Sequence, residues 1–152
     1  MKRRRFLSTT VTAVLSGATL VAMPRQSSRQ SATQTAGENL RQAVIDGCAD
    51  CVKTGRACMA MCDEMLRHGM TAMAACQMRV VEMVTMCEAM ARMAATNTAP
   101  AARLKALAAL CADTCRDCES ACRPQSAAHA ECKACMDDAA RCAKACDAYK
   151  AS

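Results

Sequence analysis

The stretch CADTCRDCESAC, residues 111–122, places four cysteines at steps of four, three and four residues. Side chains with this spacing lie along one face of an α-helix, because the helix has 3.6 residues per turn. The stretch therefore predicts a helix with a continuous stripe of thiols, and it raises the question of what such a stripe faces.

The other cysteines repeat this pattern on three further stretches. Two of them carry cysteines at steps of three, seven and four: Cys48, Cys51, Cys58 and Cys62 in one, and Cys132, Cys135, Cys142 and Cys146 in the other. The third carries Cys76 and Cys87, with Val80 and Met83 at the intermediate positions of the same face. Every stretch thus presents one stripe at helical spacing, which predicts that the stripes meet in a core.

Breaking residues divide the chain into four predicted helices. We expect them at residues 38–67, 70–95, 100–122 and 125–150, separated by His68-Gly69, by a turn that ends at Pro100, and by Arg123-Pro124. Four helices with short connections favour an up-down-up-down bundle. The predicted fold class is therefore all-α, a four-helix bundle with a cysteine-lined core, in which Gly47 and Gly55 weaken the first helix.

The composition and the charge narrow the class of protein. The chain has 14 Cys and 13 Met but one Tyr, one Phe and no Trp, so cysteine, methionine and alanine must supply the core. Six of the 20 basic residues precede Gly37, which leaves 14 basic residues against 14 acidic ones. A nucleic-acid-binding face needs clustered basic residues and stacking aromatics, so the sequence argues against that class.

Residues 1–23 predict an export signal. Arg3-Arg4-Arg5-Phe6-Leu7 is similar to the twin-arginine signal, and an uncharged, mostly apolar run follows it. This run is short and rich in Thr, Ser and Gly, which disfavours a lone membrane anchor. An ordinary secretory signal with a basic start is the alternative, and no membrane contact is expected after the signal is removed. Residues 24–37 predict a disordered spacer, and residues 38–152 the folded domain. Because the twin-arginine route carries folded proteins, the thiols would be buried before they reach the oxidising periplasm.

Disulfides fit these cysteines less well than a metal. Helical neighbours at i, i+4 have Cβ atoms about 5–6 Å apart, whereas a disulfide needs about 3.8 Å. Disulfides between helices stay open as an alternative.

Zinc and iron–sulfur clusters also fit the sequence poorly. Four thiolates around Zn²⁺ leave a double negative charge at each site, and the cysteine spacing of iron–sulfur motifs is absent.

Soft thiolate and thioether ligands select Cu(I). Two sulfurs that flank one ion need a separation of about 4.6 Å, twice a metal–sulfur bond. Four i, i+4 pairs have the spacing to reach this separation: Cys58/Cys62, Cys111/Cys115, Cys118/Cys122 and Cys142/Cys146. One Cu⁺ per thiolate is neutral, so the core could hold many ions without a net buried charge.

Methionine and histidine gather at one predicted end of the bundle. Met65, His68 and Met73 flank the first turn, and His129 begins the last helix at the same end. Weak thioether and imidazole ligands suit an entrance that passes Cu(I) to the thiols. A turn histidine in water is an equal alternative for His68. Most other methionines, such as Met78, Met86 and Met90, are expected to fill the core.

These motifs resemble the copper storage proteins over about residues 48–146. The resemblance is carried by Cys51-x₆-Cys58-x₃-Cys62-x₂-Met65-Leu66, by Met73-x₂-Cys76-x₁₀-Cys87 and by Glu131-Cys132-Lys133-Ala134-Cys135-x₆-Cys142-x₃-Cys146. It implies a four-helix bundle whose interior cysteines bind many Cu(I) ions. For exported members it also implies a twin-arginine signal, a homotetramer and a role as a copper reserve.

The resemblance extends to the entrance, with some differences. Met65 and Met73 match the methionines that line the copper entrance of the family. Met61 stands where the exported members have histidine, His68 stands where methionine is expected, and Cys48 is additional.

The sequence thus predicts an exported, periplasmic copper-binding protein and no enzyme. Its predicted metal ligands are the cysteines together with Met65, His68 and Met73, where the cysteines are Cys48, Cys51, Cys58, Cys62, Cys76, Cys87, Cys111, Cys115, Cys118, Cys122, Cys132, Cys135, Cys142 and Cys146. Two alternatives remain. A disulfide-stabilised periplasmic helical protein would have few free thiols, and a thiol redox protein would need a reactive cysteine near an exposed helix start.

Overall fold

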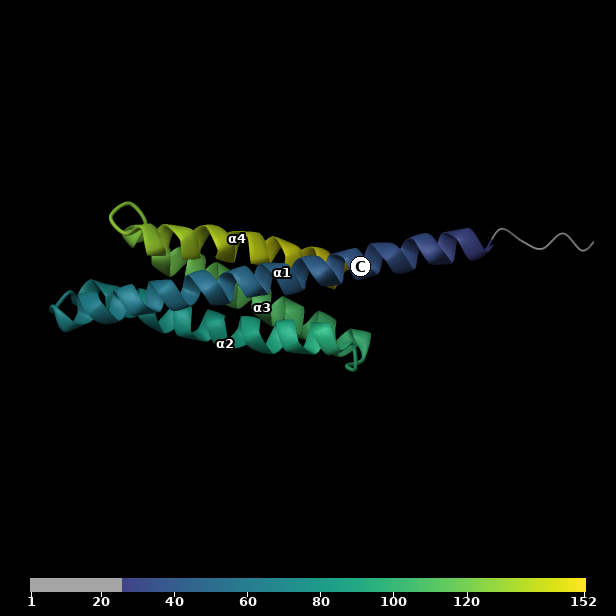
Figure 1. The fold of residues 1–152 in the computed structure, drawn as a ribbon, viewed down its shortest axis with the longest axis horizontal. Helices are drawn as coiled ribbons and strands as arrows, with labels where there is room; N and C mark the ends of the chain where they lie inside the picture. Colours follow the sequence, from purple (N-terminus) through teal and green to yellow (C-terminus); the bar gives the residue numbers. More distant parts are fainter. Residues whose placement is uncertain (1–25) are drawn as a thin grey trace, which may run out of the picture.

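The structure, a computed structural model, describes residues 26–152 as a bundle of four α-helices (Figure 1). The helices are α1 (Gln26–Arg67), α2 (Ala74–Thr96), α3 (Ala101–Cys122) and α4 (Ala130–Ala151), and two short 3₁₀ segments, η1 (Thr71–Met73) and η2 (Arg123–Gln125), precede α2 and follow α3. The described residues contain no strand. The predicted all-α, up-down-up-down bundle is confirmed.

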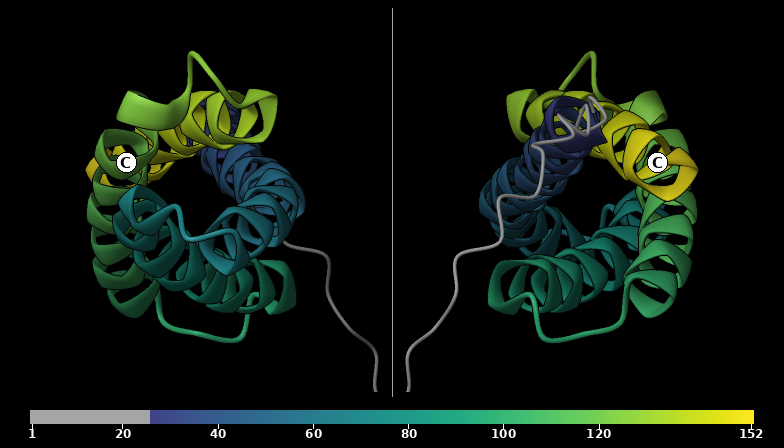
Figure 2. Two further views of the ribbon diagram at one scale, coloured as in Figure 1. Left: turned by 90° about the vertical axis from the view of Figure 1, so that its left-hand side faces the viewer. Right: turned by 90° about the vertical axis from the view of Figure 1, so that its right-hand side faces the viewer.

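Each helix packs against two neighbours around a shared interior. α1 contacts α2 and α4, and α3 contacts the same two helices from the opposite side of the ring. Figure 2 shows this ring from both ends, with the four helices surrounding one axis. Because each helix turns one face toward that axis, the cysteine stripes have a common place to meet.

Local backbone chemistry ends the helices near the predicted positions. Gly69, with φ of 83°, provides the left-handed turn after α1, a conformation that glycine adopts readily because it has no Cβ atom. Asn97 adopts the same left-handed region after α2, and Pro100 is the N-cap of α3. His129 is the N-cap of α4, so this helix begins at Ala130 and not at the predicted residue 125, because residues 123–125 form η2 and a turn follows them.

The start of α1 differs from the prediction. The helix begins at Gln26, well before Glu38, and it extends beyond the end of the other three helices (Figure 1). It therefore includes most of residues 24–37, the segment predicted to be a spacer. Residues 26–36 contain neither proline nor glycine, so no helix-breaking residue interrupts this segment. The segment is mostly polar and has no apolar residues at helical spacing, which is the pattern from which the start at residue 38 was predicted.

The predicted export signal, residues 1–23, lies outside the described residues. Within the described part of the chain, no helix combines the length and the apolar character needed to cross a membrane.

The two glycines inside α1 are points of close helix packing. A Cβ atom on Gly55 would lie 2.5 Å from Cγ2 of Val84 on α2, and one on Gly47 would lie 3.4 Å from Cα of Cys142 on α4. The missing side chains thus let α1 approach both neighbours, which offsets the lower helix propensity of glycine.

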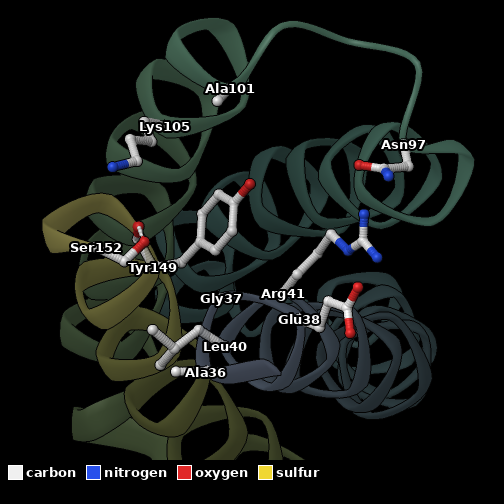
Figure 3. A pocket seen from close by; sticks show the side chains of 10 residues that line it. All are labelled: Ala36, Gly37, Glu38, Leu40, Arg41, Asn97, Ala101, Lys105, Tyr149 and Ser152. Atoms are coloured by element: carbon white, nitrogen blue, oxygen red, sulfur yellow. Dashed lines mark hydrogen bonds between the residues drawn. The ribbon is translucent and has the colours of Figure 1, made fainter. Parts of the chain in front are cut away.

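One end of the interior is closed by ordinary hydrophobic side chains. Met90 and Ala94 near the end of α2, Leu104 near the start of α3 and Tyr149 near the end of α4 are all buried there. Tyr149 also lines a pocket of about 580 Å³, shown in Figure 3, where α4 meets α1 and the start of α3. The cysteines therefore occupy the middle and the opposite end of the bundle.

Candidate metal centre

All 14 cysteines lie in the interior with at most 1% of their surface exposed, and all are free thiols. Val80 and Met83, the predicted substitutes on the stripe of α2, are also fully buried. The stripes predicted from the sequence therefore do face the shared interior.

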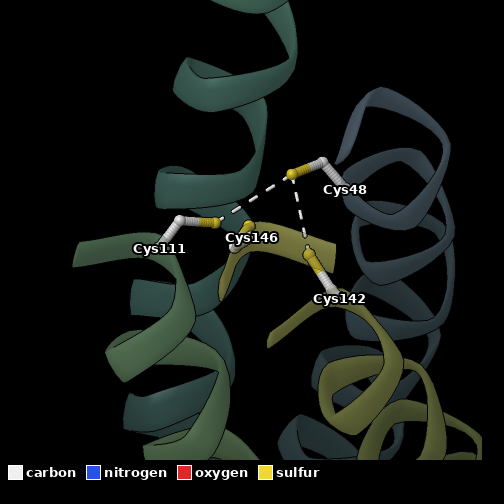
Figure 4. A group of neighbouring side chains, drawn as sticks. All are labelled: Cys48, Cys111, Cys142 and Cys146. Atoms are coloured by element: carbon white, nitrogen blue, oxygen red, sulfur yellow. Dashed lines mark hydrogen bonds between the residues drawn. The ribbon is translucent and has the colours of Figure 1, made fainter. Parts of the chain in front are cut away.

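The first group of thiols lies toward the closed end. The Sγ atoms of Cys48, Cys111, Cys142 and Cys146 all lie within 4.8 Å of one another (Figure 4). Cys48 Sγ is 3.7 Å from Cys142 Sγ and 4.0 Å from Cys111 Sγ. The additional cysteine of α1 is thus an integral member of this group.

A second group joins all four helices. It consists of Cys51, Cys87, Cys115 and Cys142, one from each helix, again within 4.8 Å of one another. Because Cys142 belongs to both groups, the two are continuous, and an ion bound in one has ligands of the other beside it.

Two further groups lie toward the other end. Cys58, Cys62, Cys76 and Cys132 form one, and Cys58, Cys122 and Cys135 form the other, so Cys58 belongs to both. The remaining thiol, Cys118, is 3.9 Å from Cys122 Sγ and 3.7 Å from Cys135 Sγ. Every cysteine therefore has another thiol within reach of a shared metal ion. We call this set of 14 side chains the thiol network.

The structure brings together three of the four predicted i, i+4 pairs. Cys118 and Cys122 are 3.9 Å apart, and the pairs Cys58/Cys62 and Cys142/Cys146 each lie within one of the groups. Cys111 and Cys115 fall in different groups, although each is 3.8 Å from Cys87 Sγ. Most of the close contacts join different helices, which no spacing within one helix could reveal.

Burial and neighbouring thiols set the protonation of the metal-free network. Burial raises the pKa of Cys132 to about 11, because the interior does not solvate a thiolate. The pKa values of Cys58 and Cys76 are also raised, first through hydrogen bonds with the Cys122 thiol. The pKa of Cys122 is lowered, first by the thiol of Cys118, and that of Cys142 is lowered, first by the thiol of Cys111.

These shifts describe an interior that stays close to neutral. The pKa is raised for most of these thiols and lowered for Cys122 and Cys142, so most sulfurs keep their protons in the metal-free interior. A monovalent metal ion that replaces one proton on one sulfur leaves the net charge unchanged, so the network can fill without a growing charge in the interior.

Methionine and histidine residues lie at the end of the bundle away from Tyr149. The α1–α2 turn and the α3–α4 connection share this end, which we call the mouth (Figure 1). Met73 is fully buried there, Met65 is partly buried, and Met70 is 43% exposed. The His68 side chain is 68% exposed and its Nε2 lies 2.9 Å from Glu64 Oε1. His129, the N-cap of α4, is partly buried.

The prediction that Met78 fills the core is wrong. Met78 is 61% exposed, whereas Met90 is fully buried and Met86 is partly buried, as expected. The reason is the phase of α2: Cys76, Val80, Met83 and Cys87 occupy its buried face, and Met78 lies between them on the outer side.

A comparison with known protein families indicates the function of this cysteine-lined interior. The family model described as copper storage protein matches residues 37–151. The chain belongs to the copper storage protein family.

A solved structure agrees with this assignment. The chain is similar to apo copper storage protein 3 from Bacillus subtilis, with a TM-score of 0.60 and 28% sequence identity. The match covers 72% of this chain and 97% of that one. No curated protein sequence matches the chain at the significance required.

Family and geometry together give the function of the thiol network. A member of a copper storage family with 14 buried cysteines in several metal-capable groups stores copper and binds several copper ions per chain. What the sequence did not show is how the groups connect. Cys58 and Cys142 each belong to two groups. The Sγ atoms of Cys76 and Cys122, which lie on different helices, are 3.1 Å apart, whereas those of Cys118 and Cys122 on one helix are 3.9 Å apart.

Proposed function

We propose that this chain is an exported copper store that holds Cu(I) on its cysteine thiolates, on the order of one ion per cysteine. The observation that supports this proposal most directly is the sharing of ligands between neighbouring groups of the thiol network. The groups that share Cys142 form one continuous set and the groups that share Cys58 form another, so each set has more ligands than the four of a single closed site. A structural zinc site, by contrast, uses four ligands in one closed tetrahedron.

The distances suit a small, soft, monovalent ion. Most of the sulfur–sulfur contacts in the metal-free network measure 3.7–4.0 Å and need only a small expansion to reach about 4.6 Å, the span of two metal–sulfur bonds. Thiolate ligands select Cu(I) over harder ions. One Cu⁺ per thiolate also avoids the charge that many divalent ions would place in a buried interior.

We assign the copper entrance to the mouth. Met73 is buried beside the first turn of α2, whose Cys76 belongs to the nearest group of thiols. Met65 is partly buried at the end of α1, and His68 is exposed one turn farther out. An incoming ion would thus meet an imidazole, then thioethers and then thiolates, in order of increasing affinity for Cu(I).

Export and assembly form the rest of the proposal. The twin-arginine-like residues Arg3-Arg4-Arg5-Phe6-Leu7 support export to the periplasm, and the resemblance to exported copper storage proteins supports a homotetramer. Exposed apolar residues on the outside of α2 and α3, among them Val81 and Leu110, provide surface for such contacts. The role proposed is binding and storage without catalysis.

The decisive experiment is an anaerobic titration of reduced, metal-free protein lacking residues 1–23 with Cu(I), in which bound copper and free thiols are counted together. We expect about ten or more copper ions per chain, with the thiols disappearing in step. Binding of only one or two ions, or few free thiols before copper is added, would contradict storage in the thiol network.

A further inference from the structure

One pair of thiols is closer than every other sulfur contact found among the described cysteines. Cys76 Sγ and Cys122 Sγ are 3.1 Å apart, whereas the other Sγ–Sγ contacts measure 3.7–4.0 Å. A disulfide bond is about 2.05 Å long. This pair therefore needs to close by about 1 Å, while the others need to close by clearly more.

The pair also lies at the ends of its two helices. Cys76 is in the first turn of α2, directly after η1, and Cys122 is the last residue of α3, directly before η2. Helix ends open at a lower free-energy cost than helix centres. Because the two residues belong to different helices, a bond between them does not have to distort a single helical turn.

The same two helices provide an internal comparison. Cys87 of α2 and Cys111 of α3 also face each other, but their sulfurs are 3.8 Å apart and both residues lie in the middle of their helices. Proximity and position at the helix ends thus both favour the pair at the mouth over a pair that links the same helices deeper in the bundle.

Ligands of a different kind lie at the same end. The Glu64 carboxylate and the His68 imidazole are 2.9 Å apart, the His68 side chain is 68% exposed and that of Glu64 is 49% exposed, and Glu64 also forms an ion pair with Arg67. Oxygen and imidazole ligands suit Cu(II), whereas thiolates select Cu(I). The mouth therefore presents groups suited to the oxidised ion on its surface and the closest thiol pair of the network inside.

We propose that Cys76 and Cys122 act as a redox pair that reduces Cu(II) to Cu(I) at the mouth. This inference rests on the proposed function, since Cu(I) is the ion that the network is proposed to hold. Each of two Cu²⁺ ions accepts one electron, two S–H bonds break, one S–S bond forms and two protons pass to solvent: 2 Cu²⁺ + 2 RSH → 2 Cu⁺ + RSSR + 2 H⁺. Cu(II) is the oxidant, and an external dithiol reopens the disulfide.

The position of the pair keeps this reaction compatible with storage. A disulfide between Cys76 and Cys122 removes one ligand from each of the two groups nearest the mouth. The groups that contain Cys48 and Cys51 keep all their thiols and remain available for the two Cu⁺ ions that the reaction produces. Copper capacity should therefore fall after the reaction and recover when the disulfide is reduced.

The test adds two equivalents of Cu(II) to reduced, metal-free protein lacking residues 1–23, without oxygen. We expect the Cu(II) electron paramagnetic resonance signal to disappear, and peptide mass mapping to find one disulfide between Cys76 and Cys122. Cys76→Ala and Cys122→Ala should slow the first phase of reduction by about tenfold or more, because the remaining thiol lacks its near partner.

Cys87→Ala and Cys111→Ala are the matched variants. All four substitutions should lower Cu(I) capacity by similar amounts, but only those at the mouth should slow Cu(II) reduction. Circular dichroism establishes that each variant is folded, and Cys76→Ser and Cys122→Ser, which keep a polar atom of similar size, should behave as the alanine variants do.

Two kinds of failure are distinguishable. Equal reduction rates in all four alanine variants, a disulfide at other cysteines, or a persistent Cu(II) signal would overturn the redox pair while Cu(I) capacity stays high. A wild-type chain that binds only one or two Cu(I) ions in the separate titration would overturn the storage proposal itself.

Discussion

The close approach of α1 and α2 at Gly55 should make this position intolerant of even one added carbon. In Gly55→Ala the new Cβ would lie 2.5 Å from Val84 Cγ2 and 2.9 Å from Met83 Cε, well inside normal contact. Overpacking of this kind costs about 1–3 kcal/mol. The same substitution raises helix propensity by about 1 kcal/mol, so we expect a net loss of about 0–2 kcal/mol in the free energy of unfolding.

Gly47→Ala and Gly37→Ala separate the two effects. The new Cβ on Gly47 would lie 3.4 Å from Cys142 Cα, at the edge of ordinary contact, and the one on Gly37 would meet no atom within 4 Å. All three positions lie in α1, so the propensity gain largely cancels when the variants are compared. Gly55→Ala should then be less stable than the other two by about 1–3 kcal/mol.

The assay is urea unfolding of the reduced, metal-free protein, followed by far-ultraviolet circular dichroism. The difference between Gly55→Ala and Gly47→Ala is the quantity of interest, because it isolates the contact with Val84 and Met83. Equal unfolding midpoints and slopes for these two variants would refute the claim that α1 and α2 approach too closely at Gly55 to accommodate a Cβ atom.

Three further predictions concern the thiol network and its entrance. Cys58→Ala should lower Cu(I) capacity more than Cys146→Ala does in an anaerobic titration, because Cys58 belongs to two groups and Cys146 to one; equal losses would contradict a shared ligand. Met73→Ala should slow copper uptake in stopped-flow measurements without lowering the final capacity, whereas the exposed Met78→Ala should change neither. The raised pKa of Cys132 favours the folded state below the unfolded thiol value of 9.0, and this contribution is lost as the pH rises to about 11. The unfolding free energy of the metal-free protein, measured against pH, should therefore fall across this range, and a flat profile would speak against a buried neutral thiol.

The thiol network also explains how a chain with so little Leu, Ile and Phe forms a core. A protonated cysteine behaves as a small hydrophobic side chain, and the apolar cluster at the closed end supplies larger groups such as Leu104 and Tyr149. Metal-free protein can therefore fold with its ligands already gathered, and copper then replaces protons in a site that exists beforehand.

The fold could be predicted from the sequence because the cysteines recur at the spacing of an α-helix. The cysteine stripes, together with the breaks at Gly69, Pro100 and Pro124, were enough to define the helices that face the interior. The prediction missed the start of α1, because residues 26–36 form helix without an apolar stripe, and it misplaced Met78, because abundance of methionine says nothing about helical phase.

What the sequence by itself determined is the identity of the ligands, their presence on one face of each helix and the class of metal that they favour. These follow from local rules: the helical period and the softness of sulfur. Only the tertiary structure decided which sulfurs meet. The sharing of Cys58 and Cys142 between groups, and the 3.1 Å approach of Cys76 to Cys122, depend on how the helices are offset along their axes and how closely they pack. Glycine contacts at Gly47 and Gly55 help to set that packing, and such contacts between distant segments leave no periodic signal in the chain.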